Sequence, residues 1–216
     1  MLLGGRIMPI WTSTASIRCS EMKRILLCML ALCLLVGTGC GGQEATAPQG
    51  EGPVTFPFTH YASGGTPEDY TATILFEESN STFTAYQVAF HSCTCRDAQS
   101  NFVTVAYVEL LNTRKSGEDA AIRTITFGNN QGLWGDSNPN YYRSEYTQEY
   151  MDQHFVQQLV KLTKRDVDAW QGYGTQVETV DPEAVAGATV STSNITSMLK
   201  GLFAYHAEKY YGEEAK

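Results

Sequence analysis

Four stretches in the first part of the chain are rich in β-branched and aromatic residues, and this composition predicts β-strands. They cover residues 70–77, 83–91, 102–111 and 121–127. The third stretch is the most continuously apolar, so we expect it near the centre of a sheet. A further short strand is expected over residues 176–180, directly after Gly172 and Gly174 break the chain.

Two stretches show the 3.6-residue period of an amphipathic helix. The first covers residues 145–170, where Met151, Phe155, Leu159 and Leu162 share one face. The second lies near the C-terminus, and its apolar stripe is formed by Ile195, Met198, Leu199, Leu202 and Phe203. His206 falls on the same stripe and is expected to be a satisfied core histidine.

Because strands come first and helices follow without steady alternation, the pattern predicts an α+β fold. We expect a mainly antiparallel sheet that is packed by a long helix and a C-terminal helix in a single domain over residues 58–216. Residues 40–57 are rich in glycine, proline and glutamine, so they are expected to form a flexible tether.

Residues 1–39 have the pattern of an export signal, with Met22 as the expected true start. An apolar run at 25–36 follows a basic pair and is too short for a comfortable membrane span. The small residues before Cys40 resemble a lipobox, although Gly37 stands where leucine is usual. We therefore expect a lipid on Cys40 that anchors the chain to the extracytoplasmic face of the cell membrane. An ordinary cleaved signal or an uncleaved anchor is the alternative.

Net charge argues against a nucleic-acid partner. The whole chain carries −8, and residues 40–216 hold 11 basic and 22 acidic residues, a balance of −11. A nucleic-acid-binding surface needs a basic patch or stripe to meet phosphates, and the sequence contains none.

The segment at 181–193 connects the last predicted strand to the last predicted helix. Gly187 can adopt a positive φ, and its alanine neighbours add only a methyl group, so a large ligand can approach this backbone. Thr189 presents a hydroxyl just beyond. The first helical turn is expected to be capped by Ser191, Thr192 or Ser193. Free N–H groups and the helix dipole favour a phosphate at such a place.

The residues Ala186-Gly187-Ala188-Thr189-Val-Ser-Thr resemble the Ser-Gly-Ala-Thr-x-Thr-Ser flavinylation motif of the FMN-binding domain family. That family includes the FMN-carrying subunits of Rnf and sodium-pumping NADH:quinone oxidoreductase complexes, and extracellular electron-transfer lipoproteins. In such proteins a flavin transferase joins the FMN phosphate to the last threonine of the motif. The resemblance therefore implies covalent FMN on Thr189.

Two positions differ from the family motif. Ala186 replaces a serine or threonine, and the acidic residue six positions before the acceptor is Glu183 rather than aspartate, with Asp181 nearby. Both changes bear on recognition by the transferase and leave the acceptor hydroxyl in place.

The resemblance covers roughly residues 103–211 and implies a second part of the flavin site. The sequence Gln131-Gly-Leu-Trp134-Gly135 stands where the family places residues close to the flavin. Trp134 can stack on an isoalloxazine ring, and Gly135 lets backbone come near it. The alternative is a turn with an aromatic side chain plugged into the core.

Only two cysteines, Cys93 and Cys95, remain for chemistry after the signal and the lipidation site are set aside. We favour a disulfide between them, in keeping with an exported chain. A metal site is the alternative, but Cys93, Cys95 and nearby His91 would need a fourth ligand to close a zinc site. Exchange of electrons between this disulfide and the flavin is a hypothesis.

The leading hypothesis for function is an extracytoplasmic lipoprotein that relays electrons through FMN on Thr189. Its partners would be a flavin transferase, a membrane redox complex or other electron carrier, and an external or periplasmic acceptor. Two alternatives stay open: a flavin-dependent reductase of a small extracellular substrate, and a non-redox binding lipoprotein that kept the fold. The sequence offers no recognisable substrate pocket, so a carrier is favoured over an enzyme with its own substrate.

Overall fold

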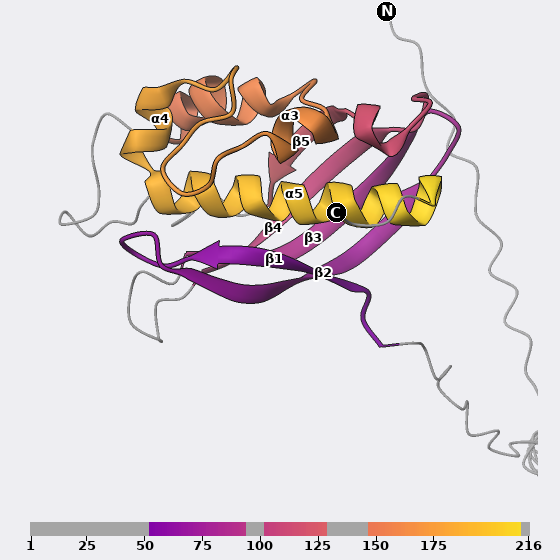
Figure 1. The fold of residues 1–216 in the computed structure, drawn as a ribbon, viewed down its shortest axis with the longest axis horizontal. Helices are drawn as coiled ribbons and strands as arrows, with labels where there is room; N and C mark the ends of the chain where they lie inside the picture. The colour runs from indigo at the N-terminus through magenta and orange to yellow at the C-terminus, as the bar shows by residue number, and fades with distance from the viewer. Residues whose placement is uncertain (1–51, 94–101, 129–146, 213–216) are drawn as a thin grey trace, which may run out of the picture. The chain divides into compact units, whose positions relative to one another are not determined.

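The computed structural model describes residues 52–93, 102–128 and 147–212 (Figure 1). Several residues named above lie outside these ranges: Cys40, Cys95, Trp134 and Gly135. The described chain forms one α+β domain.

The sheet is an antiparallel meander, in which the strands lie side by side in chain order. The strands are β1 (Thr55–Tyr61), β2 (Pro67–Ser79), β3 (Phe83–Cys93), β4 (Phe102–Leu111) and β5 (Ile122–Phe127). The four strands predicted from composition are confirmed as β2 to β5, and β4 lies between β3 and β5 inside the sheet. The α+β fold with a mainly antiparallel sheet is therefore correct.

The first strand begins inside the stretch that was expected to be a tether. β1 starts at Thr55, three residues before the expected domain boundary, and Phe56 and Phe58 are buried. Alternation of buried and exposed positions is typical of a half-buried strand. Pro57 hides the pattern in the sequence, but β1 is an edge strand, where a proline is tolerated.

The described helices lie on one side of the sheet, as Figure 1 shows for α3, α4 and α5. They are η1 (Gly117–Asp119), α2 (Gln148–Met151), η2 (Asp152–Val156), η3 (Gln157–Leu159), α3 (Lys164–Asp168), α4 (Pro182–Gly187) and α5 (Thr189–Tyr211). Among the described residues, none of these helices is both long and apolar enough to cross a membrane.

The single long helix expected over residues 145–170 is wrong. The chain leaves the helical path after η3, where Val160 is extended and Lys161 has a φ of 77°. The backbone pairs instead with β5: Lys161 N donates to the Ile122 carbonyl at 2.8 Å, and Ile122 N donates to Leu162 at 2.9 Å. Completing the hydrogen bonds of a sheet edge thus prevails over helical periodicity.

The strand expected at residues 176–180 is also absent from the described chain. This segment is a tight turn, closed by a 2.9 Å hydrogen bond from Val180 N to the Val177 carbonyl. Both valines are buried. The apolar residues that suggested a strand therefore anchor a turn against the core.

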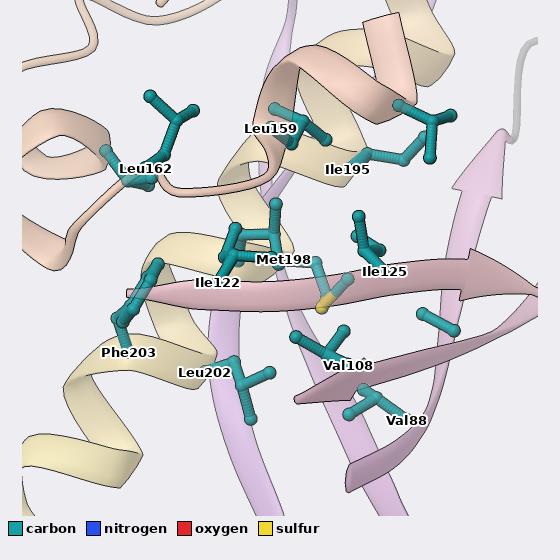
Figure 2. Close-up of a cluster of buried hydrophobic side chains, with 14 of the residues drawn as sticks. Val88, Val108, Ile122, Ile125, Leu159, Leu162, Ile195, Met198, Leu202 and Phe203 are labelled. Atoms are coloured by element: carbon teal, nitrogen blue, oxygen red, sulfur yellow. The ribbon is translucent and has the colours of Figure 1, made fainter. Parts of the chain in front are cut away.

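The core lies between the sheet and α5, and the predicted stripe of α5 faces it (Figure 2). All five stripe residues are at most 1% exposed. They pack with side chains from the sheet and from η3, including Val88, Val108, Ile122, Ile125 and Leu159.

Gly201 lets α5 approach β1 closely. A Cβ atom at this position would lie 2.5 Å from the Pro57 carbonyl oxygen and 2.9 Å from a ring carbon of Phe56. Both distances are far inside van der Waals contact, and one of the two atoms belongs to the backbone. A side chain here would therefore have to push the helix away from the edge strand.

We expect Gly201→Ala to destabilise the domain by about 2 kcal/mol, because the added methyl group overpacks this contact. Helix propensity alone predicts the opposite sign, a gain of roughly 1 kcal/mol. Urea denaturation measures the difference. Gly52→Ala is the matched control, since nothing lies within 4 Å of the Cβ built there. A more stable Gly201→Ala protein would show that the contact is not constraining.

His206 is buried, as expected, but only half of its imidazole is satisfied. Its Nδ1 pairs with the Tyr86 hydroxyl at 2.8 Å, whereas Nε2 is buried without a hydrogen-bond partner among the described residues. Burial lowers the pKa of His206 from 6.5 to about 4, against a smaller opposing effect of Glu77. The folded state therefore holds this histidine neutral in mildly acidic solution.

The free energy of unfolding should fall as the pH drops from 6.5 towards about 4, because the unfolded chain then binds a proton that folded His206 excludes. The shift corresponds to about 3 kcal/mol. His206→Gln keeps a hydrogen-bonding group for Tyr86 without titrating, so it should lose less stability in acid. Urea titrations of wild type and His206→Gln across this pH range measure the difference in unfolding free energy. The buried His60 is present in both proteins and contributes equally to each.

Candidate functional site

The segment before Thr189 is helical rather than a coil. Asp181 caps α4 by accepting a hydrogen bond from Glu183 N at 2.9 Å, and Pro182 is the first helical residue. Aspartate followed by proline is a typical helix start. Gly187 is the last residue of α4 and its φ is not positive, so the left-handed conformation open to a glycine is not used here.

Thr189 is the first residue of α5, directly after Ala188 breaks the helical path with φ −133° and ψ 43°. The Thr189 side chain is partly exposed, and its hydroxyl donates to the Ala186 carbonyl at 3.1 Å. Ala188 is the N-cap residue and has no side chain that can accept a hydrogen bond. The predicted acceptor hydroxyl thus stands at the start of a helix without a side-chain cap.

The expected capping residues lie inside α5 and do not cap it. Ser191, Thr192 and Ser193 are all buried. Thr192 Oγ1 donates back to the Ala188 carbonyl at 3.1 Å, and Ser193 Oγ accepts from Gly174 N at 3.2 Å. Because the first N–H groups of an α-helix have no partner within the helix, this start can accept an anion.

The loop at residues 172–175 borders Thr189. Gly172 and Gly174 both have positive φ, 102° and 74°, which glycine adopts without strain. A Cβ at Gly174 would lie 3.7 Å from Thr189 Cγ2. Trp170 fixes the loop, since its Nε1 donates to the Thr175 carbonyl at 2.9 Å.

Asn194 ties the start of α5 to the ends of two strands. Its Oδ1 accepts from Tyr61 N at 2.6 Å, and its Nδ2 donates to the carbonyls of Tyr61 at 3.1 Å and Ser92 at 3.0 Å. The side chain is fully buried. One amide therefore satisfies three backbone groups and fixes the position of α5 five residues after Thr189.

His154 and Asp181 link the helical layer to the cap of α4. His154 Nδ1 lies 2.9 Å from Asp181 Oδ2, and the His154 ring stacks on Tyr150 at 4.2 Å. The pKa of Asp181 is held below its usual range by the Glu183 backbone N–H first and by His154 second. His154 belongs to η2, a π-helical turn, which is a rare conformation that is frequent at functional sites. Glu183 itself is exposed.

The remaining site predictions fall at or beyond the edges of the described chain. Cys93 is disulfide-bonded, and no other described residue is a cysteine, so pairing with Cys95 stays a prediction. Within the described ranges, no group of three or more histidine, cysteine, aspartate or glutamate side chains is placed to hold a metal ion. The flavin-stacking role of Trp134 and Gly135 also stays a prediction.

A groove of about 770 Å³ lies beside the loop at 172–175, between residues 157–170 and 176–179. Trp170, Gln176 and Val177 line it, and Thr189 does not. The features around Thr189 itself fit a phosphate ester: a partly exposed hydroxyl, an uncapped helix start and adjacent glycine backbone.

Comparison with protein-family models, curated proteins and solved structures finds no match to this chain.

Replacing Asn194 should cost far more stability than replacing a neighbouring buried threonine. Asn194→Ala leaves three backbone groups of Tyr61 and Ser92 unpaired, so we expect a loss of about 3 kcal/mol. Thr192→Val is the matched control, because the Thr192 hydroxyl donates only to carbonyls at the start of its own helix. Equal midpoints of the two variants in urea would refute the role of Asn194 as a clamp.

Proposed function

We propose that this chain is an extracytoplasmic lipoprotein that carries FMN covalently on Thr189 and relays electrons between a membrane redox partner and an external or periplasmic acceptor. The observation that carries the proposal is the place of Thr189, a partly exposed hydroxyl at the first residue of an uncapped helix. The motif resemblance selects the same residue.

The chain's own groups would hold and screen the attached phosphate. The phosphate would be joined to Thr189 Oγ1, where the first N–H groups of α5 and the positive end of its dipole favour a negative charge. Bound FMN would supply the electron-transfer chemistry. Gly174 places no side chain beside the ester position, and Asn194 keeps the helix start fixed relative to the sheet.

The two departures from the family motif are compatible with this arrangement. Ala186 is exposed, and it is its backbone carbonyl that meets the Thr189 hydroxyl, so a side-chain hydroxyl at 186 is not needed to hold the acceptor. Asp181 is occupied as the α4 cap and by His154. Glu183 is exposed and is therefore the acidic side chain that a flavin transferase can reach.

Covalent flavin should follow the hydroxyl at position 189. After co-expression with a flavin transferase, wild type and Thr189→Ser should give a flavin-fluorescent band on a denaturing gel, and Thr189→Val should be dark. Valine has the shape of threonine, so folding is not at issue. Thr192→Val, a loss of hydroxyl one turn later, should stay fluorescent.

A dark wild-type band would refute the proposal and favour the non-redox binding lipoprotein. A fluorescent protein that reduces a defined small molecule over many turnovers would favour the reductase. The intact mass of the protein purified from its own host would report the flavin, the lipid on Cys40 and the disulfide in one measurement.

A further inference from the structure

The pattern Asn-x-Ser/Thr, in which an asparagine can accept an N-linked saccharide, occurs twice in the chain. The two copies are Asn80-Ser-Thr and Asn194-Ile-Thr, and the fold gives them opposite environments. Asn194 is fully buried, and its amide is hydrogen-bonded to the backbone of β1 and β3. A saccharide on Asn194 would break these bonds, so only the copy at Asn80 can carry one in the folded domain.

Asn80 lies at the tip of the hairpin that joins β2 to β3. β2 ends at Ser79 and β3 begins at Phe83, so the pattern Asn80-Ser-Thr makes up the whole connection. Residues 78–82 are all exposed. A saccharide is bulky and hydrophilic, so its acceptor has to stand on a surface of this kind.

The hairpin tip holds the Asn80 side chain in one orientation. Its Oδ1 accepts from Thr82 N at 2.8 Å and from Phe83 N at 3.0 Å, which forms an Asx turn. The oxygen and nitrogen of a planar amide point in different directions, so Nδ2 faces away from these two N–H groups. Among the described residues, neither Asn80 Nδ2 nor the Thr82 hydroxyl has a hydrogen-bond partner, so both polar groups of the pattern are available to an enzyme.

Asn112 supports the tip from the loop that follows β4. Its Nδ2 donates to the Asn80 carbonyl at 2.7 Å and to Ser79 Oγ at 3.0 Å, and its backbone N–H donates to the Thr82 carbonyl at 2.8 Å. These bonds use the backbone of Asn80 and Thr82 and leave Asn80 Nδ2 unused. A saccharide on this nitrogen would therefore displace none of the hydrogen bonds that hold the hairpin.

We propose that Asn80 is the acceptor of an N-linked saccharide. The proposal rests on export of the chain, which is part of the proposed function, and does not depend on the flavin. Glu78 is exposed two positions before Asn80, so an approaching transferase meets a carboxylate beside the acceptor.

The transfer needs a saccharide donor in the form of a lipid-linked pyrophosphate. A bond forms between Asn80 Nδ2 and the anomeric carbon of the sugar, and the bond from that carbon to the donor phosphate oxygen breaks. The lipid pyrophosphate leaves with the bonding electrons, and one Nδ2 proton passes to a base of the transferase. No electron is gained or lost by the protein.

The acceptor is far from the site proposed for the flavin. Glu77 accepts from the Tyr210 hydroxyl at 2.6 Å, so the end of β2 stands beside the last turn of α5. Thr189 is the first residue of this helix, whose 23 residues span about 34 Å. A saccharide on Asn80 and a flavin on Thr189 can therefore be carried together.

Peptide mapping of the protein purified from its own host tests the proposal. Chymotrypsin cleaves after Phe76 and Phe83, which releases residues 77–83 with Asn80 as their only asparagine. We expect most of this peptide to carry a saccharide, with the peptide that contains Asn194 as the unmodified reference. An unmodified 77–83 peptide would overturn the proposal.

Three variants isolate the acceptor pattern while they keep the hairpin tip. Asn80→Asp retains an oxygen for the N–H groups of Thr82 and Phe83 but has no amide nitrogen, so the saccharide should be lost. Thr82→Val should also lose it, whereas Thr82→Ser keeps the hydroxyl and should keep the saccharide. A saccharide that persists in Asn80→Asp would be attached to a hydroxyl and would overturn the proposal.

Flavin fluorescence of the same samples separates this proposal from the proposed function. A fluorescent protein with an unmodified 77–83 peptide would overturn the saccharide and leave the flavin carrier standing. A glycosylated protein without flavin would do the reverse, and it would support export independently of the flavin.

Discussion

One buried amide fixes the geometry on which the proposed site depends. Asn194 satisfies both backbone groups of Tyr61 and the carbonyl of Ser92, so the start of α5 is tied to the ends of β1 and β3. Tyr61 is the last residue of the edge strand β1, and Ser92 lies at the register shift of β3 between His91 and Cys93. An apolar side chain at position 194 would leave all three unsatisfied, which explains why a buried asparagine stands at this position.

The same constraint makes the first half of α5 unusual. Residues 191–199 are buried without interruption, although six of the nine are polar. Helices of soluble domains normally keep one face in water. Here the sheet end, α4 and the loop at 172–175 enclose the helix, and several polar side chains are satisfied within it, as when Thr192 and Thr196 donate to carbonyls one turn back. The start of α5 is therefore held by buried contacts, and Thr189, its first residue, is partly exposed.

Sequence patterns located the strands and the core face of α5 because both follow from local periodicity. The break in the helix expected over residues 145–170 depends on a distant strand. Residues 160–163 leave the helical path to pair with the edge of β5, and the spacing of apolar residues within 145–170 carries no information about that partner. β1 and α4 are different cases. Phe56 and Phe58 alternate as in a strand, and Asp181-Pro182 is a readable helix start, so both signals were present but were outweighed by nearby glycine, proline and small residues.

The same contrast between local patterns and contacts made through the fold applies to the candidate site. Motif reading could select Thr189, because the acceptor is defined by its neighbours in the chain. It could not predict that Ala186 contributes its carbonyl, that Gly174 lies against the threonine or that Asp181 is engaged by His154, since each contact joins residues through the fold.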